Sequence, residues 1–439
     1  METSSRVVIV GAGQAGGTAA ATLRDAGFDG SVTLLGAEPH PPYERPPLSK
    51  AYLRGATGRA DAYLAPEESW AARDVTLRTG TPVERIDRAT GHLELAGGDR
   101  IGYDRLVLAT GAAARPLEVP GADLDGVLTL RTFEDADLIR SLAHDARHVL
   151  VVGGGWIGSE VSASLRRIGV PVTVAISGSL LLETALGGTV AAVYDSLHRE
   201  NGVTVLPRTR IAAFEGDGHV RRARTAAGRL VPADLVVVAV GARPRVDLAR
   251  TAGLADSGAV VVDGLLRTED PRILAAGDVA RVPYPDLARA LQFGHWGGAQ
   301  AQGRHAARTI LGSREPYAEL PYFFSDQYDT GMDFWGDPAQ PGDVVVRGSL
   351  AERSFTAFWH EGGRVRAALT MHVHHHHEDV LDGDHADSGD EPAVPQAPAA
   401  TTHAGGHVDP ELVGALIRGP RPVDVRALGD ADVPLEELV

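Results

Sequence analysis

A short apolar run at residues 6–10 (RVVIV) opens the patterned part of the chain. It is followed by GAGQAG, by an Ala-rich stretch that ends at Gly27, and by a second apolar run at residues 31–35. Short apolar runs are typical of buried strands, and the Ala-rich stretch favours a helix. The pattern therefore predicts a compact βαβ unit with its glycines at the first turn.

The same order of elements returns at residue 148. HVLVV at 148–152 precedes GGGWIG, a stretch with helical spacing up to Gly169, and the run VPVTVAI at 170–176. The chain therefore contains two predicted βαβ units of the kind that binds dinucleotides.

Other short apolar runs lead into glycines. Residues 105–109 lead to Gly111, and residues 235–240 lead to Gly241. Ligands bind at the carboxyl ends of parallel strands, so these glycines are candidate cofactor-binding positions. Residues 271–280 are predicted to form a third strand of this kind, followed by a helix.

Past Pro321 the pattern changes to alternating aromatic and polar residues, which predicts an antiparallel sheet in a separate C-terminal domain. Residues 374–407 have almost no large apolar side chains and are rich in Asp, Pro, Ala and His. Such a composition cannot bury enough surface to offset the entropy of ordering, so we expect a disordered insertion. The segment after it regains helical periodicity.

The first glycine motif has the residues that a dinucleotide requires. Gly11 permits the tight turn, Gly13 lets the backbone approach a pyrophosphate, and Gly16 lets helix and strand pack closely. Glu38, after the second strand, is placed to accept hydrogen bonds from ribose hydroxyls. A glycine motif alone could be a structural turn, but strand, helix, second strand and acid together favour a dinucleotide site.

The second motif has all three glycines, Gly153, Gly155 and Gly158. The alternative is a degenerate duplicate that binds nothing, whereas two working sites imply a flavin and a nicotinamide. Ile176 and Ser177 stand where an acid would select NAD, and this strand end has no arginine to hold a 2′-phosphate. The choice between NAD and NADP stays open.

Composition narrows the functional classes. The 439 residues carry a net charge of -16, which argues against a nucleic-acid partner because phosphate binding needs clustered Lys and Arg. Because the chain has 0 cysteines, it can form no disulfide, has no thiolate nucleophile and cannot ligate an iron–sulfur cluster through cysteine. The strand pattern begins near the first residue and no apolar run approaches about 18 residues, so we expect a cytoplasmic protein without a signal peptide or membrane span.

Five motifs, in order and spacing, resemble the FAD-dependent ferredoxin reductases of oxygenase systems, which are putidaredoxin-reductase-like and also similar to apoptosis-inducing factor. These motifs are ERPPLSKAYL (44–53), ATGAAARP from 109, GGGWIGSE from 153, TEDPRILAAGDVA ending at 280, and PYFFSDQYD from 321. The resemblance covers nearly the whole chain. It implies FAD and NAD(P)H as cofactors and a ferredoxin-like iron–sulfur protein as partner. Phe324 departs from the pattern, since many ferredoxin reductases have Trp there.

The resemblance also implies roles for individual residues. Arg45 and Lys50 would line the flavin, Asp278 would bind its ribityl chain, and Thr110 and Gly111 would lie along the dinucleotide.

Glu160 would face the nicotinamide and pair with Lys50, which would make these two residues the catalytic pair. A lysine beside a flavin stabilises negative charge on the reduced ring, and a carboxylate partner keeps that lysine charged and in place. The alternative is that both are solvated surface charges. Trp296 matches an aromatic residue near the flavin, with core packing as the alternative.

We therefore expect an α/β fold with two Rossmann-like dinucleotide-binding domains and a C-terminal α+β domain. The FAD-binding domain would combine residues 1–115 and 248–325, the NAD(P)-binding domain would occupy 116–247, and the C-terminal domain would occupy 326–439. The expected function is electron transfer from NAD(P)H through the flavin to a ferredoxin by a monomer or homodimer. The alternatives are an NAD(P)H oxidase or quinone reductase, and a redox-sensing flavoprotein resembling apoptosis-inducing factor.

One segment has residues that could bind a metal. Four consecutive histidines at 374–377 could ligate a transition metal, but they show no spacing typical of a structural site. We interpret them as part of a solvated linker and predict no metal site.

Overall fold

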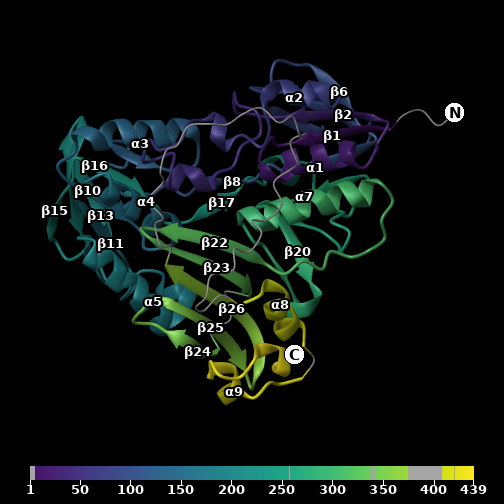
Figure 1. Cartoon of the computed structure of the whole chain (residues 1–439). Helices are drawn as coiled ribbons and strands as arrows, with labels where there is room; N and C mark the ends of the chain where they lie inside the picture. Colours follow the sequence, from purple (N-terminus) through teal and green to yellow (C-terminus); the bar gives the residue numbers. More distant parts are fainter. Residues whose placement is uncertain (1–4, 257, 338–341, 374–407, 420) are drawn as a thin grey trace, which may run out of the picture. The chain divides into compact units, whose positions relative to one another are not determined.

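The protein is described from a computed structural model that places residues 5–256, 258–337, 342–373, 408–419 and 421–439. The chain divides into two compact units, Met1–Phe323 and Phe324–Val439 (Figure 1). The histidine-rich segment 374–407 lies outside the described residues. In the part of the chain that is described, no helix is both long and apolar enough to cross a membrane.

The first unit contains a parallel five-stranded sheet of order β19-β7-β1-β2-β3. Its strands are β1 (Arg6–Val10), β2 (Ser31–Leu35), β3 (Val75–Arg78), β7 (Arg105–Leu108) and β19 (Ile273–Ala275). Helix α1 (Gln14–Asp25) connects β1 to β2, and the short α2 (Glu67–Ala72) precedes β3. The first predicted βαβ unit is confirmed. Four of the five residues of β1 are buried, as expected for a strand covered on both faces.

A second parallel sheet has the order β12-β11-β10-β16-β9. Its strands are β9 (Val127–Thr129), β10 (Val149–Val152), β11 (Val172–Ala175), β12 (Thr204–Leu206) and β16 (Leu235–Val238). The helices between them are α3 (Phe133–Asp145), α4 (Trp156–Arg167) and α5 (Glu183–Glu200). The second predicted βαβ unit, β10-α4-β11, is also confirmed.

Helix α7 (Trp296–Ile310) lies beside α1, although the two are far apart in the sequence (Figure 1). Glycine is required at this crossing, because a Cβ on Gly303 would overlap the carbonyl oxygen of Ala15. The strand predicted over 271–280 is wrong in part, since a turn at Gly277, with φ of 79°, separates β19 from β20.

Smaller sheets and helices complete the first unit, and the sequence did not predict them. They comprise β4 (Val83–Asp87), β5 (His92–Leu95) and β6 (Arg100–Gly102); β13 (Ile211–Asp217), β14 (His219–Thr225) and β15 (Leu230–Pro232); β18 (Val260–Val261), β20 (Ala280–Tyr284) and β21 (Arg289–Leu291); the pair β8 (Ala112–Ala114) and β17 (Ala242–Pro244); α6 (Asp247–Thr251); and the 3-10 turns η1 (Pro46–Ser49), η2 (Ala60–Ala62) and η3 (Pro285–Leu287).

The second unit is built on the predicted antiparallel sheet, of order β22-β23-β26-β25-β24. Its strands are β22 (Tyr322–Gln327), β23 (Thr330–Gly336), β24 (Asp343–Ser349), β25 (Ser354–Glu361) and β26 (Arg364–Val373). The sequence did not predict β24. Helix α8 (Pro410–Arg418), α9 (Val425–Gly429) and η4 (Leu435–Leu438) follow, which confirms the expected helical C-terminal segment.

Candidate active site

The first glycine turn has the shape that a pyrophosphate needs. Gly11 has φ of 117°, and a Cβ there would overlap the carbonyl oxygen of Ala109. A Cβ on Gly16 would overlap the carbonyl oxygen of Gly11. A Cβ on Gly13 would meet nothing within 4 Å. Chain contacts therefore require the first and third glycines, while the middle one leaves open space where a ligand can approach the backbone.

The second glycine turn repeats this arrangement. Gly153 has φ of 114° and lies against the carbonyl of Ala239, while Gly158 lies against the carbonyl of Gly153. A Cβ on Gly155 would meet nothing within 4 Å. The degenerate-duplicate alternative has no support here, because the second turn keeps the same open position as the first.

The helices that leave these turns lack side-chain caps. The N-cap residues of α1 and α4 are Gly13 and Gly155, and neither helix has a side-chain hydrogen bond at its N-cap. By contrast, α3 begins with a complete capping box formed by Thr132 and Asp135. The first amides of α1 and α4, together with the positive ends of the helix dipoles, therefore remain available for phosphates.

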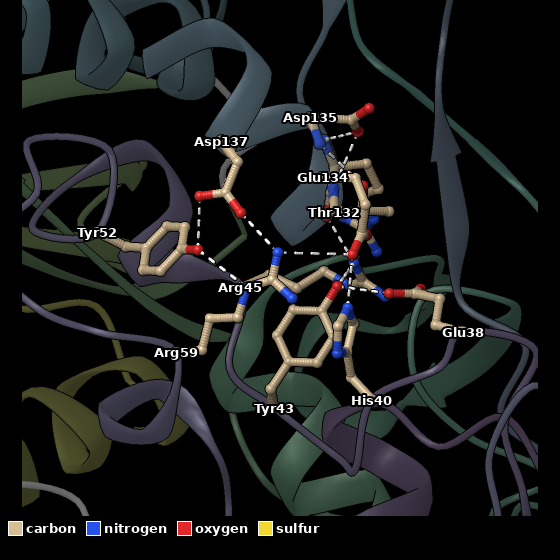
Figure 2. Close-up of polar contacts among 11 residues, drawn as sticks. Glu38, His40, Tyr43, Arg45, Tyr52, Arg59, Thr132, Glu134, Asp135 and Asp137 are labelled. Carbon is tan, nitrogen blue, oxygen red and sulfur yellow. Dashed lines mark hydrogen bonds and ion pairs between the residues drawn. The ribbon is translucent and has the colours of Figure 1, made fainter. Parts of the chain in front are cut away.

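Glu38 lies in a polar network that Figure 2 shows. Arg45 donates to one carboxylate oxygen of Glu38 at 2.6 Å, and the Tyr43 hydroxyl donates to the other at 2.5 Å. Burial alone would raise the pKa of Glu38, but the charge of Arg45 and these hydrogen bonds lower it below its usual value. Burial raises the pKa of Tyr43, so its hydroxyl stays protonated and keeps donating. The network holds Glu38 ionised at the end of the second strand, as a ribose acceptor requires.

The same network reaches the start of α3. The His40 ring lies 2.6 Å from Glu134, and Arg59 donates to Asp137 at 2.6 Å (Figure 2). The Tyr43 ring stacks on Phe133 with centroids 4.2 Å apart. These contacts fix the segment that carries Glu38 against the first turn of a helix about a hundred residues away in the sequence.

Asp278 has a partner that the sequence did not reveal. Arg131 donates to its carboxylate at 2.6 Å, and the backbone carbonyl of Arg131 accepts a hydrogen bond from Arg45. Arg45, Arg131 and Asp278 thus form a continuous polar edge that also reaches Glu38. The one local signal for Arg131 is that it directly precedes the capping box of α3.

The predicted ion pair between Lys50 and Glu160 is confirmed. The Lys50 Nζ lies 2.9 Å from a Glu160 oxygen, and the two side chains are 11% and 5% exposed. Ser49 donates to the other Glu160 oxygen, and Ser164 donates to the Ser49 carbonyl at 2.6 Å. The surface-charge alternative is wrong, because both groups are buried and held in place. Sequence reasoning missed Ser49 and Ser164, although Ser49 directly precedes Lys50.

Thr110 and Gly111 lie where the chain leaves the first sheet. The Thr110 hydroxyl donates to the carbonyl of Arg245 at 2.7 Å, and the Gly111 carbonyl accepts from the amide of Arg245 at 2.9 Å. These bonds extend the β8–β17 pair that connects the two parallel sheets. Gly241, with φ of 115°, leaves open space above its backbone. Both strand ends therefore have the glycine geometry that the sequence predicts, while their ligand contacts stay a prediction.

Trp296 begins α7 and is half-buried. Burial raises the pKa of Glu44, which belongs to the Lys50 segment, while the neighbouring indole of Trp296 lowers it. The preceding residue, His295, stacks on Phe323 with centroids 4.3 Å apart. Burial lowers the pKa of His295 to about 4, although Asp278 raises it, so the ring is neutral near pH 7. This start of α7 is therefore aromatic and uncharged.

Ile176 and Ser177 lie at the end of β11, as expected. Ile176 is 2% exposed and packs in the core, whereas Ser177 is exposed. The expectation that no arginine stands near this strand end is wrong. Arg208, from the loop after the neighbouring strand β12, brings its Nε to 3.3 Å from the Ser179 hydroxyl. The sequence could not show this, because the two loops are adjacent only through sheet pairing.

The site contains dinucleotide-binding features and no cluster of metal ligands among the described residues. Among the described residues, no group of three or more His, Asp or Glu side chains could hold a metal ion. The open glycine turns, the free helix N-termini and the ionised Glu38 instead fit two dinucleotides.

Known proteins share this architecture. The model of the pyridine nucleotide-disulphide oxidoreductase family matches residues 5–303, and a reductase C-terminal model matches residues 322–380. The chain is 39% identical to rhodocoxin reductase from Rhodococcus erythropolis, over 82% of this chain and 84% of that protein. It is 36% identical to the benzene 1,2-dioxygenase system ferredoxin–NAD(+) reductase subunit from Pseudomonas putida, over 84% and 89%.

Among solved structures, a covalent putidaredoxin reductase–putidaredoxin complex superposes with a TM-score of 0.87 at 33% identity. That match covers 100% of this chain and 98% of the other. The chain has 0 cysteines, so it cannot form the protein disulphide that the family's name refers to. The chain is an FAD- and NAD(P)H-using enzyme and belongs to the pyridine nucleotide-disulphide oxidoreductase family.

Proposed function

We propose that this protein passes electrons from NAD(P)H through FAD to a ferredoxin-type iron–sulfur protein that serves an oxygenase. Its relatives include a ferredoxin–NAD(+) reductase subunit of a dioxygenase system, and a reductase–putidaredoxin complex resembles it over the whole chain. FAD supplies the step that a nicotinamide cannot perform alone, since it accepts an electron pair and releases electrons singly. We also propose a cytoplasmic location, where reduced nicotinamides are held.

The buried pair of Lys50 and Glu160 carries this proposal. Lys50 follows η1, in the segment after the first glycine unit, and Glu160 lies in the helix of the second unit. The pair therefore joins the segment after the first glycine unit to the helix of the second unit. Two ionised groups in a buried position are costly unless each has a partner and a use.

In the proposed site, Lys50 would present a positive charge to the flavin ring of bound FAD. A buried ammonium favours negative charge developing beside it far more than an exposed one does. Glu160 and Ser49 keep this ammonium in one place, because Ser49 occupies the carboxylate oxygen that Lys50 does not use. We propose that Glu160 also faces the nicotinamide.

The other predicted site residues are assigned to the two cofactors from their positions in the fold. Residues 1–115 and 248–325 would hold FAD, 116–247 would hold NAD(P)H, and 326–439 would form the reductase C-terminal domain. Glu38 and Arg45 would bind the adenosine end of FAD, while Asp278 would hold its ribityl chain and Trp296 would lie near its ring. Arg131 supports Asp278 in this arrangement.

Turnover separates this proposal from its rivals. With NADH or NADPH, we expect cytochrome c reduction to be fast only when a [2Fe–2S] ferredoxin is added. Equal rates of oxygen consumption without ferredoxin would instead indicate an oxidase. A reduced enzyme that persists for minutes with every acceptor would indicate a redox sensor.

A further inference from the structure

We infer that Arg208, Ser177 and Ser179 form a binding site for the 2′-phosphate of NADPH. This inference rests on the proposed nicotinamide site in the second glycine unit, and it concerns which reduced nicotinamide that site selects.

Backbone hydrogen bonds hold two loops together at this place. The amide of Arg208 donates to the carbonyl of Gly178 at 2.8 Å, and the amide of Thr209 donates to the carbonyl of Ile176 at 2.7 Å. The loop after β11 and the loop after β12 are therefore fixed side by side. Arg208 has φ of 49°, a left-handed conformation that bends the chain directly after Pro207.

The paired loops lie against the second glycine turn. The amide of Leu182 donates to the carbonyl of Gly154 at 2.7 Å, and Ile176 packs over Gly154. In a dinucleotide-binding βαβ unit, the adenosine ribose lies between the glycine turn and the end of the second strand. The ribose 2′ position is therefore expected beside Ser177 and Ser179.

The side chains offered there suit a phosphate rather than a hydroxyl. No carboxylate stands at the strand end itself, since Ile176 is buried in the core and Ser177 is exposed. Arg208 is exposed and has no ion pair with any described carboxylate, and its Nε lies 3.3 Å from the Ser179 hydroxyl. An arginine guanidinium and two serine hydroxyls donate hydrogen bonds, which suits the oxygens of a phosphate. A ribose hydroxyl is instead recognised by a carboxylate that accepts its hydrogen bond.

One charge opposes this assignment. Glu183 lies near Gly178, and its Oε2 accepts from the amides of Ser179 and Leu180 at 2.6 and 3.3 Å. That oxygen is therefore turned to the loop backbone, and two amide dipoles offset its charge. If Glu183 instead serves as the ribose acceptor, the site selects NADH, which the following experiment detects.

The test uses the full-length FAD-loaded protein and two nucleotide halves, 2′,5′-ADP and 5′-AMP, in isothermal titration calorimetry. These ligands differ only in the 2′-phosphate, and we expect the wild type to bind 2′,5′-ADP roughly tenfold or more tightly than 5′-AMP, the size of one charge-assisted phosphate contact. Arg208→Gln should abolish this preference and leave the 5′-AMP affinity within about twofold. Arg208→Lys should keep part of it, because a point charge replaces the fork.

The matched control is Arg221→Gln, which removes one positive charge from an exposed position in β14 of the same unit. It should change neither affinity. Ser177→Asp should weaken 2′,5′-ADP alone, since a carboxylate repels the phosphate. The inference is overturned if the wild type prefers 5′-AMP, or if Arg208→Gln weakens both ligands equally, as stacking on adenine would predict. If neither nucleotide binds, the nicotinamide site itself is wrong. Ferredoxin turnover plays no part in this assay, so a failure of the electron-acceptor proposal is seen separately.

Discussion

Replacing Lys50 and Glu160 singly and together tests whether they act as one unit. We consider Lys50→Met, Glu160→Gln and the double variant, each loaded with FAD. The ion pair spans 2.9 Å, and its side chains are only 11% and 5% exposed, so water compensates little for a lost partner. Removing a preorganised charge of this kind costs about 10²- to 10³-fold in rate, or about 3–4 kcal/mol of activation free energy.

We expect Lys50→Met to slow flavin reduction by about this factor. Glu160→Gln should slow it by a similar factor, because the ammonium then loses the carboxylate that holds it, although Ser49 can still contact the amide. If the two residues acted independently, the double variant would lose about 6–8 kcal/mol. As a coupled pair they should lose about 3–4 kcal/mol together, which gives an interaction energy of roughly 3 kcal/mol.

The assay is anaerobic stopped-flow bleaching of the flavin absorbance at saturating NADPH and at saturating NADH. FAD content is measured in parallel, and it should fall far less than the rate. Arg222→Gln is the control, since Arg222 and Glu215 form an ion pair of similar length, 2.8 Å, at a position where Arg222 is 54% exposed. Additive losses in the double variant, or unchanged reduction by Lys50→Met, would refute the argument.

Three further predictions follow from the geometry of the site. Gly11→Ala should prevent correct folding, because its Cβ overlaps a backbone carbonyl, whereas Gly13→Ala should fold and retain less FAD; soluble yield and the ratio of visible to ultraviolet absorbance distinguish them. Arg131→Ala should lower FAD content by leaving Asp278 without its 2.6 Å partner, and normal content would count against their joint role. The pKa of His295 is lowered from 6.5 to about 4, so the unfolded chain binds its proton more readily and stability should fall from about pH 6.5 to pH 4 by at most about 3 kcal/mol. His295→Gln should flatten this part of the denaturation profile, and an unchanged slope would contradict the assignment.

The strongly periodic parts of the fold were predictable from the sequence. The runs at residues 7–10 and 149–152 are buried on both faces, so their apolar character is continuous, and the glycines that follow mark the turns. The predicted strand at residues 31–35 has the observed bounds. The small antiparallel sheets were not predictable in this way, because strands such as β14 (His219–Thr225) carry three exposed arginines and show no continuous apolar run.

The residues of the candidate site also differ in how far the sequence could predict them. Residues inside a local motif, such as Gly13 and Glu38, could be identified because the motif itself defines their chemistry. Partners brought by tertiary structure could not be identified: Arg131 reaches Asp278 across 147 positions, and Arg208 reaches Ser179 across 29. The pairing of Lys50 with Glu160 was expected from family resemblance, but its burial became evident only from the packing of α4 against η1.

The central claim, that this chain is a nicotinamide-dependent flavoprotein, is tested most directly by one spectrum. The purified protein is placed under nitrogen, its visible absorbance is recorded, and NADPH or NADH is added in steps. We predict a yellow protein with one FAD per chain, bleached by about one equivalent of reduced nicotinamide, with NADPH the more effective donor at low concentration. A colourless protein that takes up no added FAD, or a yellow one that neither nicotinamide bleaches, would contradict the account.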